Sequence, residues 1–290
     1  LATLVLCVAN PVTVAALESG HPEELLGAVL CVGSVLAAIR NRPMWAAVLL
    51  GLAVANKEWA LLAVGPVLVA LPRQRMRALL VAGSVATVVL LPLVVAGSLT
   101  SAHGGATISS SIFTPWQVWW FIGQHVHHVE RNQPWVTRIE PQWLTPLAHP
   151  LIIGVAAPLT AVHAWVRRRQ ACTAPISPLL LLVLLLLLRC MLDPWDNWYY
   201  PLPFLIALVS WEALAFARPP LVSLAMSLAA WFLFQWAVPA HGFTSDQQGL
   251  LFLALTLPTA VGVSLLLYAP RSRELLTRLV RRGVLAIPDT

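Results

Sequence analysis

Two short polar segments that lie between apolar runs hold side chains able to do chemistry. The first reads Glu18-Ser-Gly-His21-Pro-Glu23-Glu24. Its carboxylates could bind a cation, or one of them could take a proton from a hydroxyl as a general base. The alternative is a polar loop that enters a helix, with Glu23 and Glu24 placed favourably at the positive end of the helix dipole.

The second segment reads Asp193-Pro-Trp-Asp196-Asn-Trp198-Tyr199-Tyr200 and crowds acids and aromatic rings together. Aromatic faces beside carboxylates suit sugar rings, because C–H faces stack on the rings while hydroxyls reach the acids. The alternative is an aromatic belt, since Trp and Tyr are enriched at membrane interfaces. Both readings stay open at the level of sequence.

Charges inside apolar runs are costly and indicate function. Arg189 lies one helical turn before Asp193, so it could form a helix-end ion pair with that acid or bind an anion such as a phosphate. Lys57 lies in a polar tip beside Glu58, and it could pair with Glu58 or face an anionic headgroup. Further along, we expect Glu212 to snorkel or to pair with Arg218.

Metal and nucleotide signatures are weak in this chain. His125 and His128 are three residues apart and could share a helix face, but a solvated loop explains them more simply. The sequence has no phosphate-binding glycine-rich loop and no GxSxG or HExxH motif. We therefore expect neither a metal site nor a cofactor.

Composition places these segments in a membrane protein. The chain has 290 residues, of which 59% are hydrophobic and 10% are charged. Soluble domains are about 45–50% apolar and about 25% charged, so we exclude a soluble enzyme, a disordered chain and a disulfide scaffold. The net charge of +6 comes from arginines clustered between apolar runs, which indicates membrane topology rather than binding to nucleic acid.

Arginine positions order the predicted spans, because positive residues stay on the cytoplasmic side. The basic segment 271–290 is therefore expected to be cytoplasmic. Residues 44–71 have arginines on both sides, which predicts a hairpin of two short helices, 44–55 and 59–71, instead of one crossing. The other predicted spans, the first of them broken at Asn10-Pro11, cover 1–17, 24–39, 78–98, 147–165, 176–192, 199–216, 220–238 and 249–269.

The outer loop 99–146 is predicted to hold one helix near 115–130. Thr114-Pro115-Trp116-Gln117 has the pattern of a capped helix start. An aromatic stripe follows at helical spacing, which suits a helix lying in the outer headgroup plane. The predicted fold is an all-α polytopic transmembrane bundle in the plasma membrane, with its acidic residues gathered on the outer face.

Three stretches resemble polytopic glycosyltransferases of the GT-C fold. Asn10-Pro11 followed by Leu17–His21 resembles the "NP…L..GQ/GH" stretch of glycosyltransferase family 87, which includes actinobacterial polyprenyl-phosphate-mannose-dependent mannosyltransferases. Arg42-Pro43, Ala46–Lys57 and the run to Pro72 resemble that family's "AG-LLGLA---K---LL--P" signature. Residues 193–203 lie where the family often has "SP-SW-HH---LLP", with Tyr199 and Tyr200 in place of the two histidines.

The resemblance implies a sugar donor on a polyprenyl phosphate and an inverting transfer to a hydroxyl of a lipid or glycan acceptor. Arg189, Lys57 and His21 would stabilise the leaving phosphate. The other substrate-binding candidates are Glu23, Glu24, Asp193, Asp196, Tyr199 and Tyr200. The family's catalytic Asp lies in the first outer loop, so we expect the base upstream of residue 1, and a fragment without it to be inactive.

Two other classes of function remain as alternatives. A secondary transporter or flippase would need polar residues near the middle of the membrane and an internal repeat. The predicted spans after residue 78 have few such residues, which disfavours this class. A non-catalytic membrane scaffold is the remaining alternative.

Overall fold

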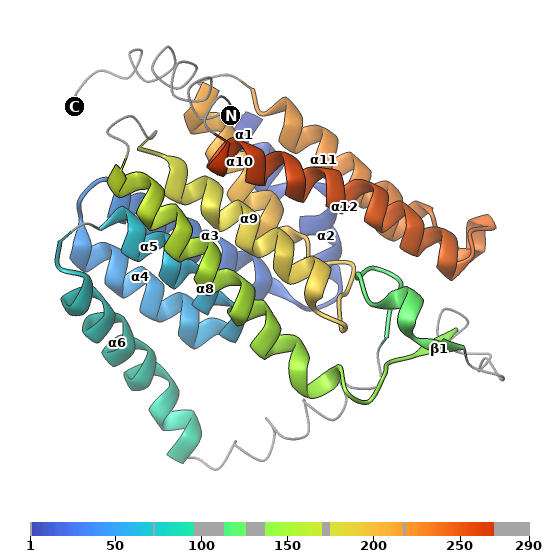
Figure 1. The fold of residues 1–290 in the computed structure, drawn as a ribbon, viewed down its shortest axis with the longest axis horizontal. Coiled ribbons are helices and arrows are strands. Elements are labelled where there is room, and N and C mark those ends of the chain that lie inside the picture. The colour runs from blue at the N-terminus through green and yellow to red at the C-terminus, as the bar shows by residue number, and fades with distance from the viewer. Residues whose placement is uncertain are drawn as a thin grey trace.

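The computed structural model describes residues 2–71, 73–95, 113–125, 137–169, 175–216 and 219–269. These residues form a bundle of helices (Figure 1). Strands in this part of the chain are limited to β1 (Gln124–His125) and β2 (Arg138–Ile139), which pair antiparallel. The predicted all-α bundle is therefore confirmed.

The first predicted span is two helices, α1 (Ala2–Val8) and α2 (Pro11–Glu18), which are separated at Asn10. The side chain of Asn10 accepts a hydrogen bond of 2.9 Å from the backbone N–H of Thr13 and so caps α2. Pro11 takes the first helical position, where a missing N–H costs no hydrogen bond.

The later helices are α3 (Pro22–Ile39), α4 (Pro43–Asn56), η1 (Glu58–Ala63), α5 (Val64–Ala70), α6 (Arg75–Val95), η2 (Trp120–Ile122), α8 (Thr145–Arg169), α9 (Ser177–Leu192), α10 (Leu202–Phe216), α11 (Leu221–Trp231), η3 (Phe232–Trp236), η4 (Pro239–His241) and α12 (Ser245–Tyr268).

Residues 44–71 form two short helical pieces, α4 and then η1 with α5. Between them Lys57 has an extended backbone, with φ −152° and ψ 136°. Figure 1 shows the connection into α4 and the connection out of α5 at the same end of the bundle. The chain therefore turns back at Lys57, as the arginines on both sides predict.

Helix α9 lies at the centre and packs against α3, α5, α8, α10 and α12. Every residue from Leu179 to Leu187 is buried. A helix that is apolar on all sides belongs in a core, so the Leu-rich run serves packing between helices. This central position places the last turn of α9, which contains Arg189, among the helices around it.

Four described helices, α3, α6, α8 and α12, are long and apolar enough to cross a membrane. Large apolar side chains of all four are exposed, among them Val29, Val88, Ile153 and Val261. Exposed aliphatic side chains at this density suit contact with lipid rather than water. Together these helices indicate a membrane protein.

The predicted helix near 115–130 is wrong in its described part, which contains only η2 and β1. The backbone N–H of Val118 donates to the carbonyl of Met191 at 2.9 Å. The indole N–H of Trp119 donates to the carbonyl of Leu192 at 2.8 Å. The last carbonyls of a helix have no partner within it. The segment therefore satisfies the end of α9 instead of forming its own helix, while residues 126–136 lie outside the described part.

The same segment is also attached to α12. The indole N–H of Trp120 donates to Asp246 at 2.8 Å, and Arg138 donates to both carboxylate oxygens of Asp246 at 3.1 Å. Trp120 is fully buried in this arrangement. We call residues 113–125 the strap, because they connect the end of α9 to the start of α12.

Glu212 is buried and caps a helix. Its carboxylate accepts hydrogen bonds from the backbone N–H groups of Val222 and Ser223 and from the Ser223 hydroxyl, at 2.8–2.9 Å. The prediction that Glu212 snorkels is wrong, because the first N–H groups of α11 offer it a complete set of donors. Arg218 and the basic segment 271–290 lie outside the described residues, so the predictions for them stay predictions.

Candidate functional site

One end of the bundle brings all the candidate residues of the sequence together. They come from the turn before α3, the first turn of α3, the turn between α4 and η1, the last turn of α9 and the loop from α9 to α10. We call this group the polar cluster. Its members are His21, Glu23, Glu24, Lys57, Arg189, Asp193, Asp196, Tyr199 and Tyr200.

Glu24 lies at the centre of the polar cluster and is 1% exposed. One of its carboxylate oxygens faces the indole N–H of Trp59 at 3.4 Å and the ammonium of Lys57 at 3.6 Å. The other oxygen faces Nη1 of Arg189 at 3.8 Å. Three donors therefore surround this carboxylate at distances longer than the 2.7–3.2 Å of ordinary hydrogen bonds.

Arg189 is 4% exposed and lies between two aromatic rings. Its guanidinium carbon is 5.0 Å from the ring centre of Trp59 and 4.1 Å from that of Tyr200, which gives two cation–π contacts. The expected helix-end pair with Asp193 is wrong, because the ion pair of Arg189 is with Glu24. The carboxylate of Asp193 instead accepts from the backbone N–H of its own loop, at Trp195.

Lys57, Glu23 and His21 form the more exposed side of the polar cluster. Lys57 lies 3.2 Å from Glu23, so the expected pair between Lys57 and Glu58 is also wrong. The ring nitrogen Nδ1 of His21 lies 2.9 Å from the same Glu23 oxygen. His21 also stacks on Tyr199, with ring centres 4.1 Å apart. These contacts join the start of α3 to the α9–α10 loop.

Asp196 is 0% exposed. One of its side-chain oxygens accepts from the backbone N–H of Asn197 at 2.8 Å, and its carbonyl accepts from the Thr114 hydroxyl of the strap. Burial, together with the nearby charge of Asp193, raises the pKa of Asp196 well above its usual range. The raised pKa extends the pH range over which the acid is protonated, and the protonated form can donate a hydrogen bond as well as accept one.

Sequence reasoning missed two supports of the polar cluster, Asn56 and Trp59. The amide of Asn56 donates to the carbonyl of Glu23 at 2.8 Å. Gly27 of α3 makes room for both, since a Cβ there would lie 2.9 Å from the Asn56 amide nitrogen and 3.0 Å from the Trp59 ring. Asn56 and Trp59 lie one and two residues from Lys57 in the sequence. This closeness to a candidate residue could have identified them as parts of the site.

Sequence reasoning also missed His149, Glu140 and Trp195, which lie beside the α9–α10 loop. His149 lies 4.0 Å from the carboxylate of Asp193 and meets the Trp195 ring edge-on. The indole N–H of Trp195 donates to Glu140 at 3.0 Å. No spacing in the sequence connects these residues, so only the fold brings them together.

Three buried polar atoms of the polar cluster have no hydrogen-bond partner among the described residues. They are Oε2 of Glu24, Nη1 of Arg189 and Oδ2 of Asp196. Buried polar atoms of proteins almost always have a partner, so each such atom calls for an explanation. The described residues contain no group of three His, Cys, Asp or Glu side chains placed to hold a metal ion.

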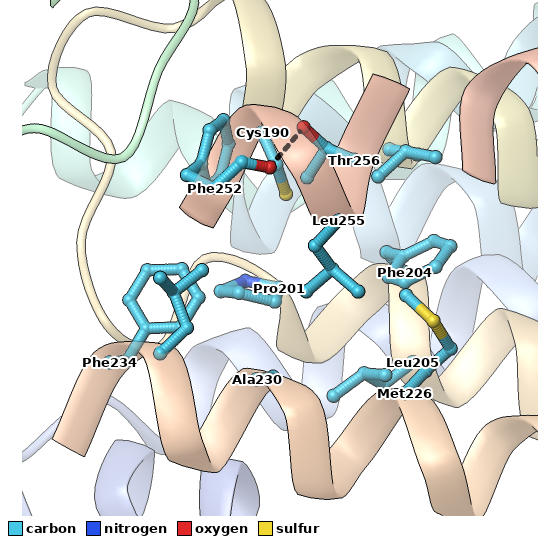
Figure 2. Close-up of a pocket in the computed structure, with 12 residues that line it drawn as sticks. Cys190, Pro201, Phe204, Leu205, Met226, Ala230, Phe234, Phe252, Leu255 and Thr256 are labelled. Carbon is cyan, nitrogen blue, oxygen red and sulfur yellow. Dashed lines mark hydrogen bonds between the residues drawn. The ribbon is translucent and has the colours of Figure 1, made fainter. Parts of the chain in front are cut away.

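An apolar cavity lies elsewhere, between α9, α10, α11 and α12 (Figure 2). Its volume is about 20 Å³, and no polar surface lines it. The hydroxyl of Thr256 donates to the carbonyl of Phe252 at 2.7 Å and is therefore already used. The cavity thus offers packing space and no chemistry, which leaves the polar cluster as the candidate site.

Comparison with family models, with curated proteins and with solved structures finds no match to this chain. The case for a function therefore stands on the polar cluster and on the motifs of the sequence. In chemical terms, the cluster offers cations, carboxylates and aromatic faces at one end of an apolar bundle. A ligand that carries both hydroxyl groups and a phosphate would use all three.

Proposed function

We propose that the protein is a membrane glycosyltransferase of the GT-C type. It transfers a sugar, which we propose to be mannose, from a polyprenyl-phosphate donor to an acceptor hydroxyl of a lipid or glycan. The observation that supports this proposal is the polar cluster, in which cations, carboxylates and aromatic rings from five segments meet. The reaction class is taken from the sequence motifs that resemble those of glycosyltransferase family 87.

In the proposed reaction the acceptor oxygen forms a bond to the anomeric carbon of the donor sugar. The bond from that carbon to the phosphate oxygen breaks, and its electron pair leaves with the polyprenyl phosphate. The acceptor proton passes to a carboxylate base, which the resemblance assigns to an Asp in the first outer loop of the family. The described residues are therefore assigned to binding and to charge stabilisation.

The cations of the polar cluster have a clear role in this scheme. Arg189, Lys57 and His21 supply positive charge where negative charge develops on the leaving phosphate. Arg189 and Lys57 are already paired with Glu24 and Glu23, at 3.8 and 3.2 Å. These pairs hold the cations in place before the donor arrives, so less reorganisation accompanies the reaction.

The proposal also includes a place in the cell, a multi-pass position in the plasma membrane with the carboxyl terminus in the cytoplasm. Arg40 directly follows α3, whereas Glu23 and Glu24 lie in its first turn. The positive-inside rule then puts the polar cluster at the outer face. A lipid-linked donor would reach it from the outer leaflet.

The test is transfer of labelled mannose from mannosyl polyprenyl phosphate, with the full-length protein reconstituted in liposomes. We expect a covalent glycosyl product, and we expect Arg189→Ala to lower turnover about 100- to 1,000-fold, as loss of a charge-stabilising group does. The matched control is Glu18→Gln, because Glu18 is exposed at the end of α2 and is outside the polar cluster.

Two results would contradict the proposal. Uptake of substrate by the vesicles without any covalent product would identify a transporter or flippase. Unchanged turnover of Arg189→Ala, at equal amounts of folded protein by thermal unfolding, would remove Arg189 from the mechanism. Arg189→Lys, which keeps the charge but not the planar group, separates a need for charge from a need for shape.

A further inference from the structure

The contact between Glu24 and Arg189 is incomplete. Oε2 of Glu24 and Nη1 of Arg189 lie 3.8 Å apart, and neither atom has a hydrogen-bond partner among the described residues. A direct N–H···O bond would need 2.7–3.2 Å. Two charges have therefore been taken out of water without the short hydrogen bonds that normally offset that cost.

The neighbours of this pair do not complete it. Trp59 and Lys57 face the other oxygen of Glu24, at 3.4 and 3.6 Å. The guanidinium of Arg189 is held by ring faces, which offer no lone pair. Oε2 and Nη1 therefore face each other across a gap that the described protein groups leave unbridged.

One oxygen atom placed about 2.8 Å from each side would bridge such a gap. That oxygen must accept from the guanidinium and donate to the carboxylate. A hydroxyl does both, since it has one proton and two lone pairs. An ionised phosphate oxygen has no proton to donate, and Glu24 would repel it.

We propose that Glu24 and Arg189 recognise one hydroxyl group of a sugar ring. The hydroxyl donates to Oε2 of Glu24 and accepts from Nη1 of Arg189. That the ligand is a sugar rests on the proposed function, whereas the need for a hydroxyl follows from the contacts themselves. The positive charge of Arg189 still acts on a nearby phosphate, because charge interactions in a buried site extend over several ångströms.

Asp196 provides a second observation in the same place. Its Oδ2 is buried and has no hydrogen-bond partner in the described part of the chain, and Arg189 and Glu24 act electrostatically on its carboxyl group. Unpartnered atoms on α3, on α9 and in the α9–α10 loop thus lie at the same end of the bundle. A ring that carries several hydroxyls can serve more than one of them, which a single ion cannot do.

The test is a panel of mannosyl polyprenyl phosphates that each lack one hydroxyl, compared on the wild type and on Glu24→Gln. On the wild type we expect removal of one particular hydroxyl to lower kcat/KM about 10- to 100-fold, as loss of a hydrogen bond to a charged group does. On Glu24→Gln the same removal should cost less, about three- to tenfold, because one of the two charged partners of the hydroxyl has become a neutral amide while Arg189 remains. Each ratio is taken on one variant, so it is independent of the folded fraction.

Equal ratios in the wild type and Glu24→Gln would overturn the inference. It would also be overturned if the wild type discriminated against no member of the panel, because water alone would then fill the gap. Glu18→Gln should reproduce the ratios of the wild type. If no donor is turned over at all, the proposed function fails, and the same ratios are then read from donor Kd values. A Glu24-dependent ratio of Kd values would keep the hydroxyl site even so.

Discussion

Glu24 and Glu212 are the same residue type, each 1% exposed, and yet their surroundings are opposite. Glu212 accepts three hydrogen bonds of 2.8–2.9 Å from the start of α11. Glu24 faces three donors at 3.4, 3.6 and 3.8 Å, and one of its oxygens has no hydrogen-bond partner among the residues that the structure describes. Burial alone therefore does not separate a structural carboxylate from one that is available to a ligand.

The lesson is that satisfaction of hydrogen bonds, rather than burial, separates the two regions. A buried acid with a full set of donors holds the fold together, because removing it leaves those donors unpaired. A buried acid with long contacts adds little to stability and keeps its capacity for another molecule. Three variants test this distinction.

The largest effect is expected at the structural carboxylate. Glu212→Ala leaves the backbone N–H groups of Val222 and Ser223 and the Ser223 hydroxyl without their acceptor. We expect the free energy of unfolding to fall by at least about 3 kcal/mol, since one hydrogen bond to a charged group contributes about 1.5–3 kcal/mol and three are lost. Denaturation in detergent measures the loss, and transfer per folded molecule should stay near that of the wild type.

The second effect is expected at the polar cluster, in the double variant Glu24→Leu with Arg189→Met. Replacing both members of a buried ion pair by apolar residues is often neutral or stabilising. We expect the free energy of unfolding to change by less than about 1 kcal/mol while sugar transfer falls at least about 100-fold. A fall in stability as large as that of Glu212→Ala would erase the difference between the two carboxylates.

The smallest effect concerns pH and Asp196. Its folded pKa lies above the unfolded value of about 3.9, so the folded state binds more protons between those two values. The free energy of unfolding therefore falls as the pH rises through that window. Asp196→Asn should flatten this part of the stability curve, on which the charges of Asp193, Arg189 and Glu24 act through the same carboxyl group. Parallel curves for the variant and the wild type, from unfolding at several pH values, would contradict the prediction.

Much of the fold could be predicted because apolar runs and their breaks are local signals. The break at Asn10-Pro11 and the turn at Lys57 follow from side chains adjacent in sequence. The nine candidate residues meet because each lies at an end of an apolar run. The partner of Arg189 could not be predicted, since Glu24 on α3 is distant in sequence and the i,i+4 rule considers only Asp193.

The same four-residue pattern at two places shows where local reasoning stops. Thr244 and Gln247 form a complete capping box at the start of α12. Thr114 and Gln117 have the same spacing, but the Thr114 hydroxyl donates to the carbonyl of Asp196 instead. The α9–α10 loop thus takes the hydroxyl that would cap a local helix, and the last carbonyls of α9, which lack partners within the helix, accept from Val118 and Trp119.

The strap also has a consequence for the order in which the protein is made. The indole of Trp120 donates to Asp246, which lies 126 residues later in the chain. At a synthesis rate of about 5–20 residues per second, Trp120 waits on the order of ten seconds for its acceptor. The strap can therefore complete its contacts only after the start of α12 has been synthesised, although its contacts with the end of α9 can form earlier.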